Sequence, residues 1–386
     1  MATSDRMAAA RRAIAEFAEE KLDRIRARSL HRRLRPTLRS EGGRADREGR
    51  RLVSFSDNDY LGLSTDPRVK QAAADAALRH GAGAGASRLV TGDCPLYAEL
   101  EAALAAMKGT EAALVFGSGY LANISVIPVL ARPGDHILLD ALSHACMHAG
   151  ARLSGAIVET FRHNDAEDLR ARLAASAAAR KLVLTETVFS MDGDLAPLDA
   201  IAEACADHGA WMMTDDAHGF GVVDAPNPAP LQMGTLSKAA GGYGGYVCGP
   251  RPFIDLLINR ARGFVFTTGL PPAALGAAIE ALRIMKAEPA RGARALAHAR
   301  RFSRALDLPA AQSAIVPVIL GSADETLAQS QWLAENGFLV TAIRPPTVPA
   351  GTARLRVSFS SGHRQEDVEA LCEAMKQMQA MAKAEA

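Results

Sequence analysis

Short apolar runs alternate with longer amphipathic stretches through the middle of the chain. Between residues 95 and 215 this pattern predicts helices at 95–107, 120–131, 144–152, 165–178 and 197–208, alternating with strands at 112–116, 136–140, 156–160, 181–187 and 210–215. The strands lack strict polar alternation, which is expected when helices cover both faces of a sheet. The order predicts an α/β fold with a mostly parallel sheet and right-handed crossovers.

The two ends of the chain follow other patterns. An apolar repeat predicts a helix over 8–30, and a short strand is expected at 51–56. A glycine-rich turn and one strand are expected within 235–249, and 254–288 is predicted to be helical. The last part predicts a smaller α+β unit, with helices 290–306, 324–336 and 364–382 and strands 314–320, 338–343 and 353–359. We therefore expect an N-terminal helical and basic segment (1–50), a large α/β domain (51–288) and a small C-terminal domain (289–386).

Composition and charge narrow the class of protein. The chain has 386 residues, of which 48% are hydrophobic but only 5% aromatic, so the core is expected to consist of Ala, Leu, Val and Ile. With 44 basic and 43 acidic residues, the chain as a whole is not suited to nucleic acid or an acidic membrane. The segment 21–51 nevertheless contains 12 Lys and Arg residues, which form either a solvated face or a basic rim for an anionic carrier.

Targeting signals and metal motifs are not expected. The five cysteines form no CxxC pair, and an odd number favours free thiols in a reducing compartment, so a cytoplasmic location is expected. Residues 112–131 carry no charge and are long enough to span a membrane, but Gly117, Asn123 and Pro128 interrupt them. We interpret this stretch as a strand, a tight turn and a helix.

Ligands of open α/β sheets bind beyond the carboxyl ends of the strands, so the residues that follow each strand are candidates for chemistry. After 112–116, Gly117-Ser-Gly-Tyr120 opens a helix and favours a phosphate, although a plain glycine turn is the alternative. His144 follows the next strand, where it could stack on a flat ring, act as an acid or simply cap a helix. A polar turn, FSMDGD (189–194), follows the strand 181–187.

Two further features point to a covalent cofactor. Asp215 and Asp216 end a buried strand, where acids are costly unless a positive group meets them. Lys238 lies among small residues without an acidic neighbour in sequence, which favours a lowered pKa and a nucleophilic amine; a solvated lysine in a glycine loop is the alternative. Together with the phosphate turn and His144, these residues fit pyridoxal 5′-phosphate, which needs a lysine, an acid and a phosphate cup.

Eight motifs give the chain its resemblance to the α-oxoamine synthases, a family of fold-type I enzymes that use pyridoxal 5′-phosphate. They are SFSDNDYLGL (54–63), GAGASRLVTG (83–92), FGSGYLAN (116–123), SHA (143–145), FSMDGDLAPL (189–198), DDAHGFGV (215–222), GTLSKAAGGYGG (234–245) and PPTVPAGTARLRVSFSSGH (345–363). The resemblance covers residues 15–380. It implies a large cofactor-binding domain, a smaller C-terminal domain, and the decarboxylative joining of an amino acid to an acyl thioester.

The resemblance also implies which residues hold the cofactor. Lys238 would bind it covalently and move the α-proton, while Asp215 would pair with the pyridinium nitrogen. His144 would stack on the ring. The other residues placed around the cofactor are His218 and Ser190 at the ring oxygen, Gly119, Tyr120, Thr235 and Ser237 at the phosphate, and Thr267 and Thr268 at the phosphate of a partner subunit in a homodimer.

Substrate contacts follow from the same resemblance. Arg356 would hold the amino-acid carboxylate, and the alternation in ARLRVSFS places Arg354, Arg356 and Ser358 on one face of a strand. Asn58 and Arg32 would border the substrate. One departure is Tyr97, which stands where many relatives have His.

Within the family, DDAHGFGV and FSMDGDLAPL resemble the members that join L-alanine to a pimeloyl thioester in biotin synthesis. The carrier is either coenzyme A or an acyl carrier protein. The alternatives are the glycine C-acetyltransferases of the same family and, outside it, a non-catalytic phosphate- or nucleotide-binding module that uses the Gly117 turn.

Overall fold

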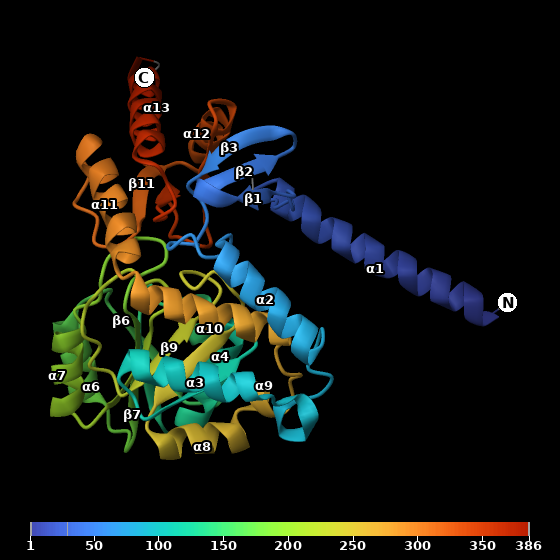
Figure 1. The fold of residues 1–386 in the computed structure, drawn as a ribbon, viewed down its shortest axis with the longest axis vertical. Coiled ribbons are helices and arrows are strands. Elements are labelled where there is room, and N and C mark those ends of the chain that lie inside the picture. Colours follow the sequence, from blue (N-terminus) through green and yellow to red (C-terminus); the bar gives the residue numbers. More distant parts are fainter. Residues whose placement is uncertain (1, 29, 385–386) are drawn as a thin grey trace.

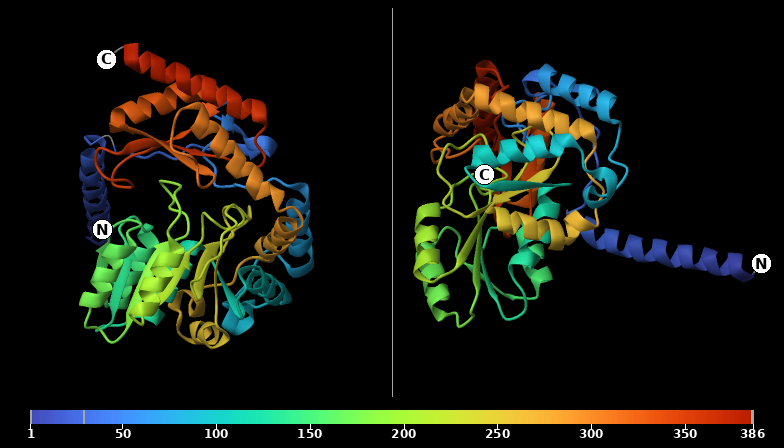
Figure 2. Two further views of the ribbon diagram at one scale, coloured as in Figure 1. Left: turned by 90° about the vertical axis from the view of Figure 1, so that its left-hand side faces the viewer. Right: turned by 60° about the horizontal axis from the view of Figure 1, so that its bottom comes forward.

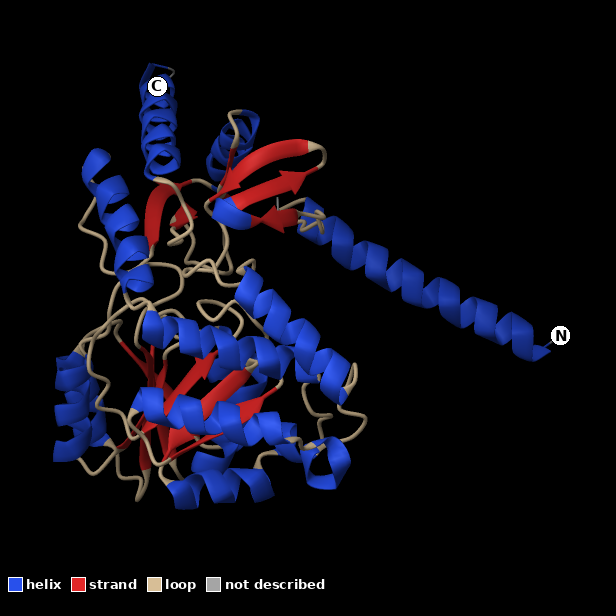
Figure 3. Ribbon diagram, in the orientation of Figure 1, coloured by secondary structure: helices blue, strands red, loops and turns tan. Residues whose placement is uncertain are grey.

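The computed structural model describes residues 2–28 and 30–384, which form a large α/β body, a smaller C-terminal unit and a projecting N-terminal helix (Figures 1 and 3). The helices are α1 (Ala2–Arg26), α2 (Pro67–His80), α3 (Pro95–Lys108), α4 (Gly119–Leu130), α5 (Ala145–Ser154), α6 (Ala166–Ala175), α7 (Leu198–Asp207), α8 (Arg251–Arg260), α9 (Arg262–Val265), α10 (Pro272–Ala287), α11 (Ala290–Ala305), α12 (Ala323–Glu335) and α13 (Gln365–Ala384), with a 3-10 turn, η1 (Glu41–Gly43), and a π turn, η2 (Arg88–Gly92). The strands are β1 (Leu38–Ser40), β2 (Arg44–Arg47), β3 (Arg50–Ser54), β4 (Ala112–Phe116), β5 (His136–Asp140), β6 (Ile157–Phe161), β7 (Lys181–Glu186), β8 (Trp211–Asp215), β9 (Leu231–Thr235), β10 (Gly245–Gly249), β11 (Ile315–Gly321), β12 (Phe338–Leu339), β13 (Thr341–Ile343) and β14 (Ala353–Ser358).

A seven-stranded sheet forms the centre of the large body. Its strand order is β4-β10-β9-β8-β7-β5-β6, and every pairing is parallel except the two made by β10. Because β10 runs antiparallel to both β4 and β9, the carboxyl ends of the other six strands meet at one edge of the sheet. The predicted α/β fold with a mostly parallel sheet is confirmed.

Helices cover both faces of this sheet because its strands are apolar on both sides. Along β4, Ala113 and Val115 pack with residues of α3 and α10, whereas Leu114 and Phe116 pack with residues of α4 and α8. Such two-sided burial explains the apolar runs that lack polar alternation. Figure 1 shows α2, α3 and α10 together over one face of the sheet.

The C-terminal unit is built around a second core. A three-stranded antiparallel sheet, β11-β14-β13, packs against α11 and α13, and Figure 2 shows it apart from the large sheet. A four-stranded sheet, β1-β2-β3-β12, lies beside it. Val53 of β3 and Phe55 belong to the same core as Leu355 and Phe359. The predicted boundary at residues 50 and 51 stays a prediction, although β3, which follows it, pairs with β12.

The structure contains elements that the sequence pattern missed. Helix α2 is rich in alanine and buries few large side chains, so its periodicity is weak, yet it packs closely on α10, where a Cβ on Gly276 would lie 2.6 Å from the Ala76 Cβ. Strand β9 (LQMGT) was not predicted either. The single strand predicted at 338–343 is wrong: the chain changes sheets at Val340, so β12 pairs with β3 while β13 pairs with β14.

Most other elements agree with the prediction to within a few residues. The strands predicted at 112–116 and 136–140 have those bounds, and the strand, turn and helix predicted within 112–131 are confirmed as β4 and α4. Within the described part of the chain, no helix has both the length and the apolar character to cross a membrane. The predicted helix at 8–30 corresponds to α1, although residue 29 lies outside the described residues.

Candidate active site at the carboxyl edge of the sheet

The predicted strand-end residues come together at the carboxyl edge of the large sheet. Asp215 ends β8 and lies opposite Glu186, which ends the parallel neighbour β7. His144 follows β5, and Thr235 ends β9. Gly245, the first residue of β10, pairs with Phe116 on one side and Thr235 on the other, which brings the turn after β4 beside the end of β9.

Lys238 lies at the centre of this edge. Its Nζ is 2.7 Å from Nε2 of His218, so the amine and the imidazole are within hydrogen-bonding distance. Burial lowers the pKa of Lys238 and outweighs the opposing charges of Asp215 and Glu186. This agrees with the expectation of a lowered lysine pKa. An amine with a lowered pKa can act as a nucleophile and accept a proton near neutral pH.

A chain of hydrogen bonds continues from Lys238 to the C-terminal unit. The Tyr60 hydroxyl lies 2.6 Å from Nδ1 of His218 and donates to Oδ1 of Asn58 at 3.1 Å. Since the hydroxyl has a single proton, Nδ1 of His218 is the donor to Tyr60, and Nε2 is left as the acceptor for the lysine. Burial holds the pKa of His218 well below 6.5, so the imidazole is neutral. Arg356 completes the chain by donating to the Tyr60 oxygen at 3.3 Å.

Arg356 is a buried cation in the middle of β14. Its Nε donates to the backbone oxygen of Ser190 at 2.6 Å, and its Nη1 donates to Oγ of Ser358 at 2.7 Å. Among the described residues, no carboxylate lies within 4.0 Å of its guanidinium. A buried guanidinium without a carboxylate partner is suited to a ligand that brings one. The alternation predicted for this strand is confirmed, since Leu355 and Val357 point into the hydrophobic core on the other side.

The two adjacent acids at the end of β8 have different environments. Asp216 is paired with Lys108 at 2.6 Å and accepts from Thr187. Asp215 accepts from the backbone N–H of Ala217 and from Nδ2 of Asn123, both at 2.9 Å. Burial raises the pKa of Asp215, while the nearby Lys238 opposes that effect. Asp215 is thus the acid of this pair that remains available to a cationic ligand.

His144 is the N-cap of α5. Its Nδ1 accepts from the backbone N–H of Cys146 at 3.3 Å and lies 2.8 Å from the thiol of the same residue. Neutral His144 therefore carries its ring proton on Nε2. Burial lowers its pKa, which favours the neutral form. The backbone N–H of His144 donates to Glu186 at 2.6 Å, which ties this loop to the end of β7.

The turn between β4 and α4 has the features of an anion site. Ser118 caps the helix by accepting from Leu121 N–H, so Gly119 and Tyr120 present the first backbone N–H groups of a 12-residue helix. Thr235 and Ser237 lie alongside, with 2.8 Å between their hydroxyl oxygens. The turn and β10 approach closely, because a Cβ on Gly245 would lie 2.5 Å from the Gly119 nitrogen. These residues fit the phosphate of pyridoxal 5′-phosphate, as Lys238 and Asp215 fit its aldehyde and its ring nitrogen.

Some predicted residues lie elsewhere. Thr268 forms an isolated bridge with Ser87, on the loop between α9 and α10. Arg32 contacts Thr347, in the proline-rich loop before β14, at 3.4 Å. Tyr97, the departure from the family pattern, is buried and accepts from the backbone N–H of Leu270 at 2.5 Å.

Three residues of the site were missed from the sequence. Glu186 is buried at the end of a strand, so the strand-end rule that found Asp215 would have found it too. Tyr60 lies two residues after Asn58 in the SFSDNDYLGL motif. Asn123 lies in the first turns of α4, and no local pattern distinguishes it from other polar helix residues. All three depend on contacts between distant segments.

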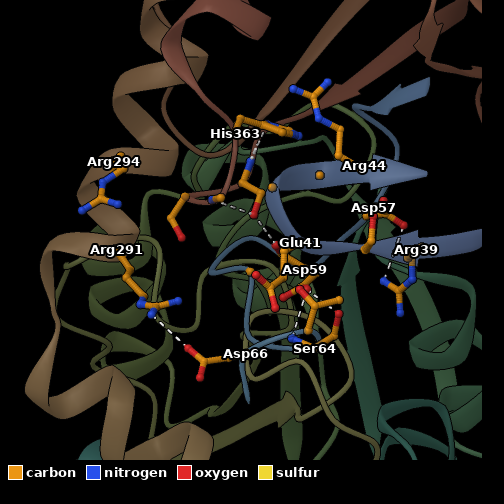
Figure 4. A pocket seen from close by; sticks show the side chains of 18 of the residues that line it. Arg39, Glu41, Arg44, Asp57, Asp59, Ser64, Asp66, Arg291, Arg294 and His363 are labelled. Carbon is orange, nitrogen blue, oxygen red and sulfur yellow. Dashed lines mark hydrogen bonds and ion pairs between the residues drawn. The ribbon is translucent and has the colours of Figure 1, made fainter. Parts of the chain in front are cut away.

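A separate cavity of about 720 Å³ lies between the N-terminal strands, the start of α2 and the start of α11. Its charged residues are largely paired with one another, as Arg291 is with Asp66 at 3.1 Å and Arg39 with Asp57 at 3.5 Å (Figure 4). Its lining includes none of the residues that surround Lys238. We therefore place the candidate site at the sheet edge and not in this cavity.

The sequence and the fold are both similar to those of known proteins. Residues 50–375 match the profile of the aminotransferase class I and II family. An 8-amino-7-oxononanoate synthase of Methylobacterium radiotolerans is 62% identical over 361 residues, covering 93% of this chain and 96% of that protein. Among solved structures, the 8-amino-7-oxononanoate synthase of Francisella tularensis has a TM-score of 0.73 and 26% identity, covering 86% of this chain and 98% of that one. A serine palmitoyltransferase variant from S. paucimobilis, solved with a bound PLP–myriocin aldimine, has a TM-score of 0.90 and 27% identity, covering 96% of this chain and 99% of that one.

Proposed function

The chain belongs to the aminotransferase class I and II family, and we propose that it is a pyridoxal phosphate-dependent acyltransferase that joins L-alanine to a pimeloyl thioester. The products are 8-amino-7-oxononanoate, CO2 and the free thiol of the carrier. The observation that carries this proposal is the buried Lys238 amine, which lies 2.7 Å from the neutral imidazole of His218. The same edge of the sheet holds Asp215 and Arg356, and Arg356 has no carboxylate partner among the described residues. The identity of the acyl group as pimeloyl is inferred from the similarity to 8-amino-7-oxononanoate synthases.

We propose that the residues at the sheet edge hold the cofactor by its three functional groups. Lys238 is the covalent attachment point, Asp215 accepts from the protonated ring nitrogen, and the N–H groups of Gly119 and Tyr120 bind the phosphate. When bound, the cofactor supplies an electron-accepting ring that stabilises negative charge at the α-carbon of the amino acid. The remaining contacts are proposed for His144 on the ring face, His218 and Ser190 at the ring oxygen, and Thr235 and Ser237 at the phosphate.

The chain's own residues then bind the amino acid and move its proton. Arg356 receives the alanine carboxylate, while Asn58, Arg32 and Ser358 border the substrate. The Lys238 amine, whose pKa is lowered by burial, takes the α-proton and later returns a proton to the product. His218 keeps this amine in place, since its Nε2 accepts from Nζ and its Nδ1 is held by Tyr60.

We also propose a homodimer with shared active sites and a cytoplasmic location. Thr267 and Thr268 would reach the phosphate of the partner subunit from the loop between α9 and α10. A mixture of Lys238→Ala with a Thr267→Ala/Thr268→Ala double variant tests this, because hybrid dimers would regain one intact site and hence part of the activity. The location rests on the cysteines, all five of which are free thiols, as expected in a reducing compartment.

Product identification by mass spectrometry tests the proposed reaction. Purified protein is incubated with alanine and pimeloyl thioesters, and separately with glycine and acetyl-CoA. We expect 8-amino-7-oxononanoate from the first pair; preferential turnover of the second would instead identify a glycine C-acetyltransferase. Lys238→Ala should abolish both turnover and the borohydride-reducible attachment of the cofactor, whereas Lys70→Ala, a surface control, should not. Full turnover in Lys238→Ala would overturn the proposal.

A further inference from the structure

A second cavity, of about 670 Å³, lies between the segment that follows α1 and the edge strand β13. One wall is formed by residues 30–35 and the other by Thr341–Ile343, the loop that follows and Leu327 of α12. Figure 1 shows the C-terminal end of α1 beside β1. The volume lies within the range of small-molecule binding sites.

The lining of this cavity is cationic. It includes His31, Arg32, Arg33, Arg35 and Arg344, while none of its described lining residues is an aspartate or glutamate. The cavity of Figure 4 differs in this respect, because its arginines face carboxylates of the same chain. Clustered guanidinium groups favour a multiply charged anion, and above all a phosphate, which they can bind in a bidentate manner.

The same cavity has an apolar side. Leu30, Leu327, Ile343 and Pro345 complete its lining. A site that combines cationic and apolar walls is suited to a ligand in which a phosphate is joined to a less polar chain or ring, and not to inorganic phosphate alone. The side chains of Arg32, Arg33 and Arg35 are exposed and therefore accessible to such a ligand.

The cavity is one strand away from the candidate active site. In the sheet, Thr341 of β13 is the direct neighbour of Arg356 on β14, and Ile343 is the neighbour of Arg354. Directly opposed residues of antiparallel strands project from the same face, and adjacent strands are about 4.8 Å apart. A ligand whose phosphate occupies the cavity can therefore extend past this strand toward the site around Arg356.

We propose that this cavity binds the phosphate-bearing end of the thioester carrier, with Arg33 and Arg35 as its main phosphate ligands. The inference rests on the proposed function, because only a reaction with an acyl thioester brings such a carrier to Arg356. Coenzyme A and the phosphopantetheine arm of an acyl carrier protein share this chemistry. The cavity accordingly binds the phosphate of the carrier, while the acyl group lies beyond β13.

The test compares thioesters with and without phosphate. Steady-state kinetics are measured with pimeloyl-CoA, with pimeloyl-carrier protein and with pimeloyl-pantetheine, which has no phosphate. In Arg33→Gln/Arg35→Gln, KM for at least one phosphorylated thioester should rise by about tenfold or more. KM for alanine, KM for pimeloyl-pantetheine and kcat should not change. The matched control is Arg50→Gln/Arg51→Gln, which removes two exposed charges of the same basic run from residues that do not line the cavity.

The outcome also identifies the source of the phosphate. An effect confined to pimeloyl-CoA assigns the cavity to the coenzyme, and one confined to the carrier protein assigns it to the phosphopantetheine arm. Unchanged KM values, or equal increases with all three thioesters, would overturn the inference. Calorimetric binding of free coenzyme A and of phosphopantetheinylated carrier protein gives a readout besides activity. In a further outcome, the protein makes no oxononanoate while the native chain binds either carrier and Arg33→Gln/Arg35→Gln does not. In that case the proposed function fails but the proposed phosphate site is supported.

Discussion

Glu186 and Asp215 lie opposite each other at the ends of two neighbouring parallel strands. Both are buried, but they differ in their hydrogen bonds and in the charged groups nearby. Asp215 accepts two hydrogen bonds and faces the Lys238 amine. Glu186 accepts one, from the backbone N–H of His144, and burial together with the Asp215 charge raises its pKa well above 4.5. Burial raises the pKa of Asp215 as well, but the nearby Lys238 and the two hydrogen bonds oppose that rise, so Asp215 is the better suited of the two acids to carry a charge.

The first prediction separates the two acids by amide substitution. Glu186→Gln should retain activity to within a few-fold, because a neutral amide oxygen can still accept from His144. Asp215→Asn should lose activity by about 100-fold or more, since it removes the charge that we propose pairs with the cofactor nitrogen. Turnover numbers of the two variants, measured at saturating substrates, check this. Equal losses in both would contradict the different roles assigned to the two acids.

The second prediction concerns alanine binding by Arg356. Lysine lacks the planar guanidinium that can bind a carboxylate through two parallel N–H groups, and in Arg356→Lys the backbone oxygen of Ser190 loses its donor. If Arg356 receives the alanine carboxylate as proposed, KM for alanine should rise by about tenfold or more. KM for the thioester should change little. Arg354→Lys serves as the control, because this neighbouring buried arginine is paired with Asp192. A comparable rise in KM for alanine in the control would argue against a specific role for Arg356.

The third prediction uses the close approach at the phosphate turn. Gly245→Ala would place a Cβ 2.5 Å from the Gly119 nitrogen and displace the turn, so cofactor affinity should fall by about tenfold or more. Gly242 lies three residues earlier, in the loop before β10, and a Cβ there would meet nothing nearer than 3.5 Å, so Gly242→Ala should bind the cofactor as the native protein does. Titration of the apoprotein with pyridoxal 5′-phosphate, followed by absorbance, measures both. The hypothesis fails if the two variants bind the cofactor equally well.

The fourth prediction is a dependence of stability on pH through His163. Its ring nitrogens lie 2.9 Å from Asp140 and 2.8 Å from Asp194. Burial alone would lower its pKa, but the hydrogen bonds to these two carboxylates raise it from 6.5 to about 10. Between pH 6.5 and about 10, His163 therefore keeps its proton in the folded chain but loses it in the unfolded chain. The stabilisation is therefore complete below pH 6.5 and disappears as the pH rises toward about 10.

Urea unfolding across this pH range provides the measurement. His163→Gln should lower the free energy of unfolding by about 1–3 kcal/mol below pH 6.5, and the difference from the native protein should shrink as the pH increases. His80→Gln, at the exposed end of α2, should leave the free energy unchanged at each pH. A difference that grows with pH would contradict the assignment of a protonated His163.

The local sequence determined most of the strand positions, because the strands are short, apolar and bounded by glycine or polar residues. The bounds of β4 and β5 and the position of Asp215 at the end of a buried strand follow from such patterns. The edge rule for parallel sheets then placed Gly119, His144 and Asp215 together without any contact being known. The weak periodicity of α2 and the short strand β9 escaped the same reasoning.

The tertiary structure decided what depends on distant partners. That Tyr60 contacts His218, that Asn123 donates to Asp215, and that the pKa of Glu186 is raised all follow from burial and from side chains that meet across the fold. The division of 338–343 between two sheets was likewise set by packing, because a run of apolar residues does not specify which strand it will pair with. Periodicity along the chain encodes which face is buried, whereas charge, protonation and ligand shape depend on neighbours that only folding brings within a few ångströms.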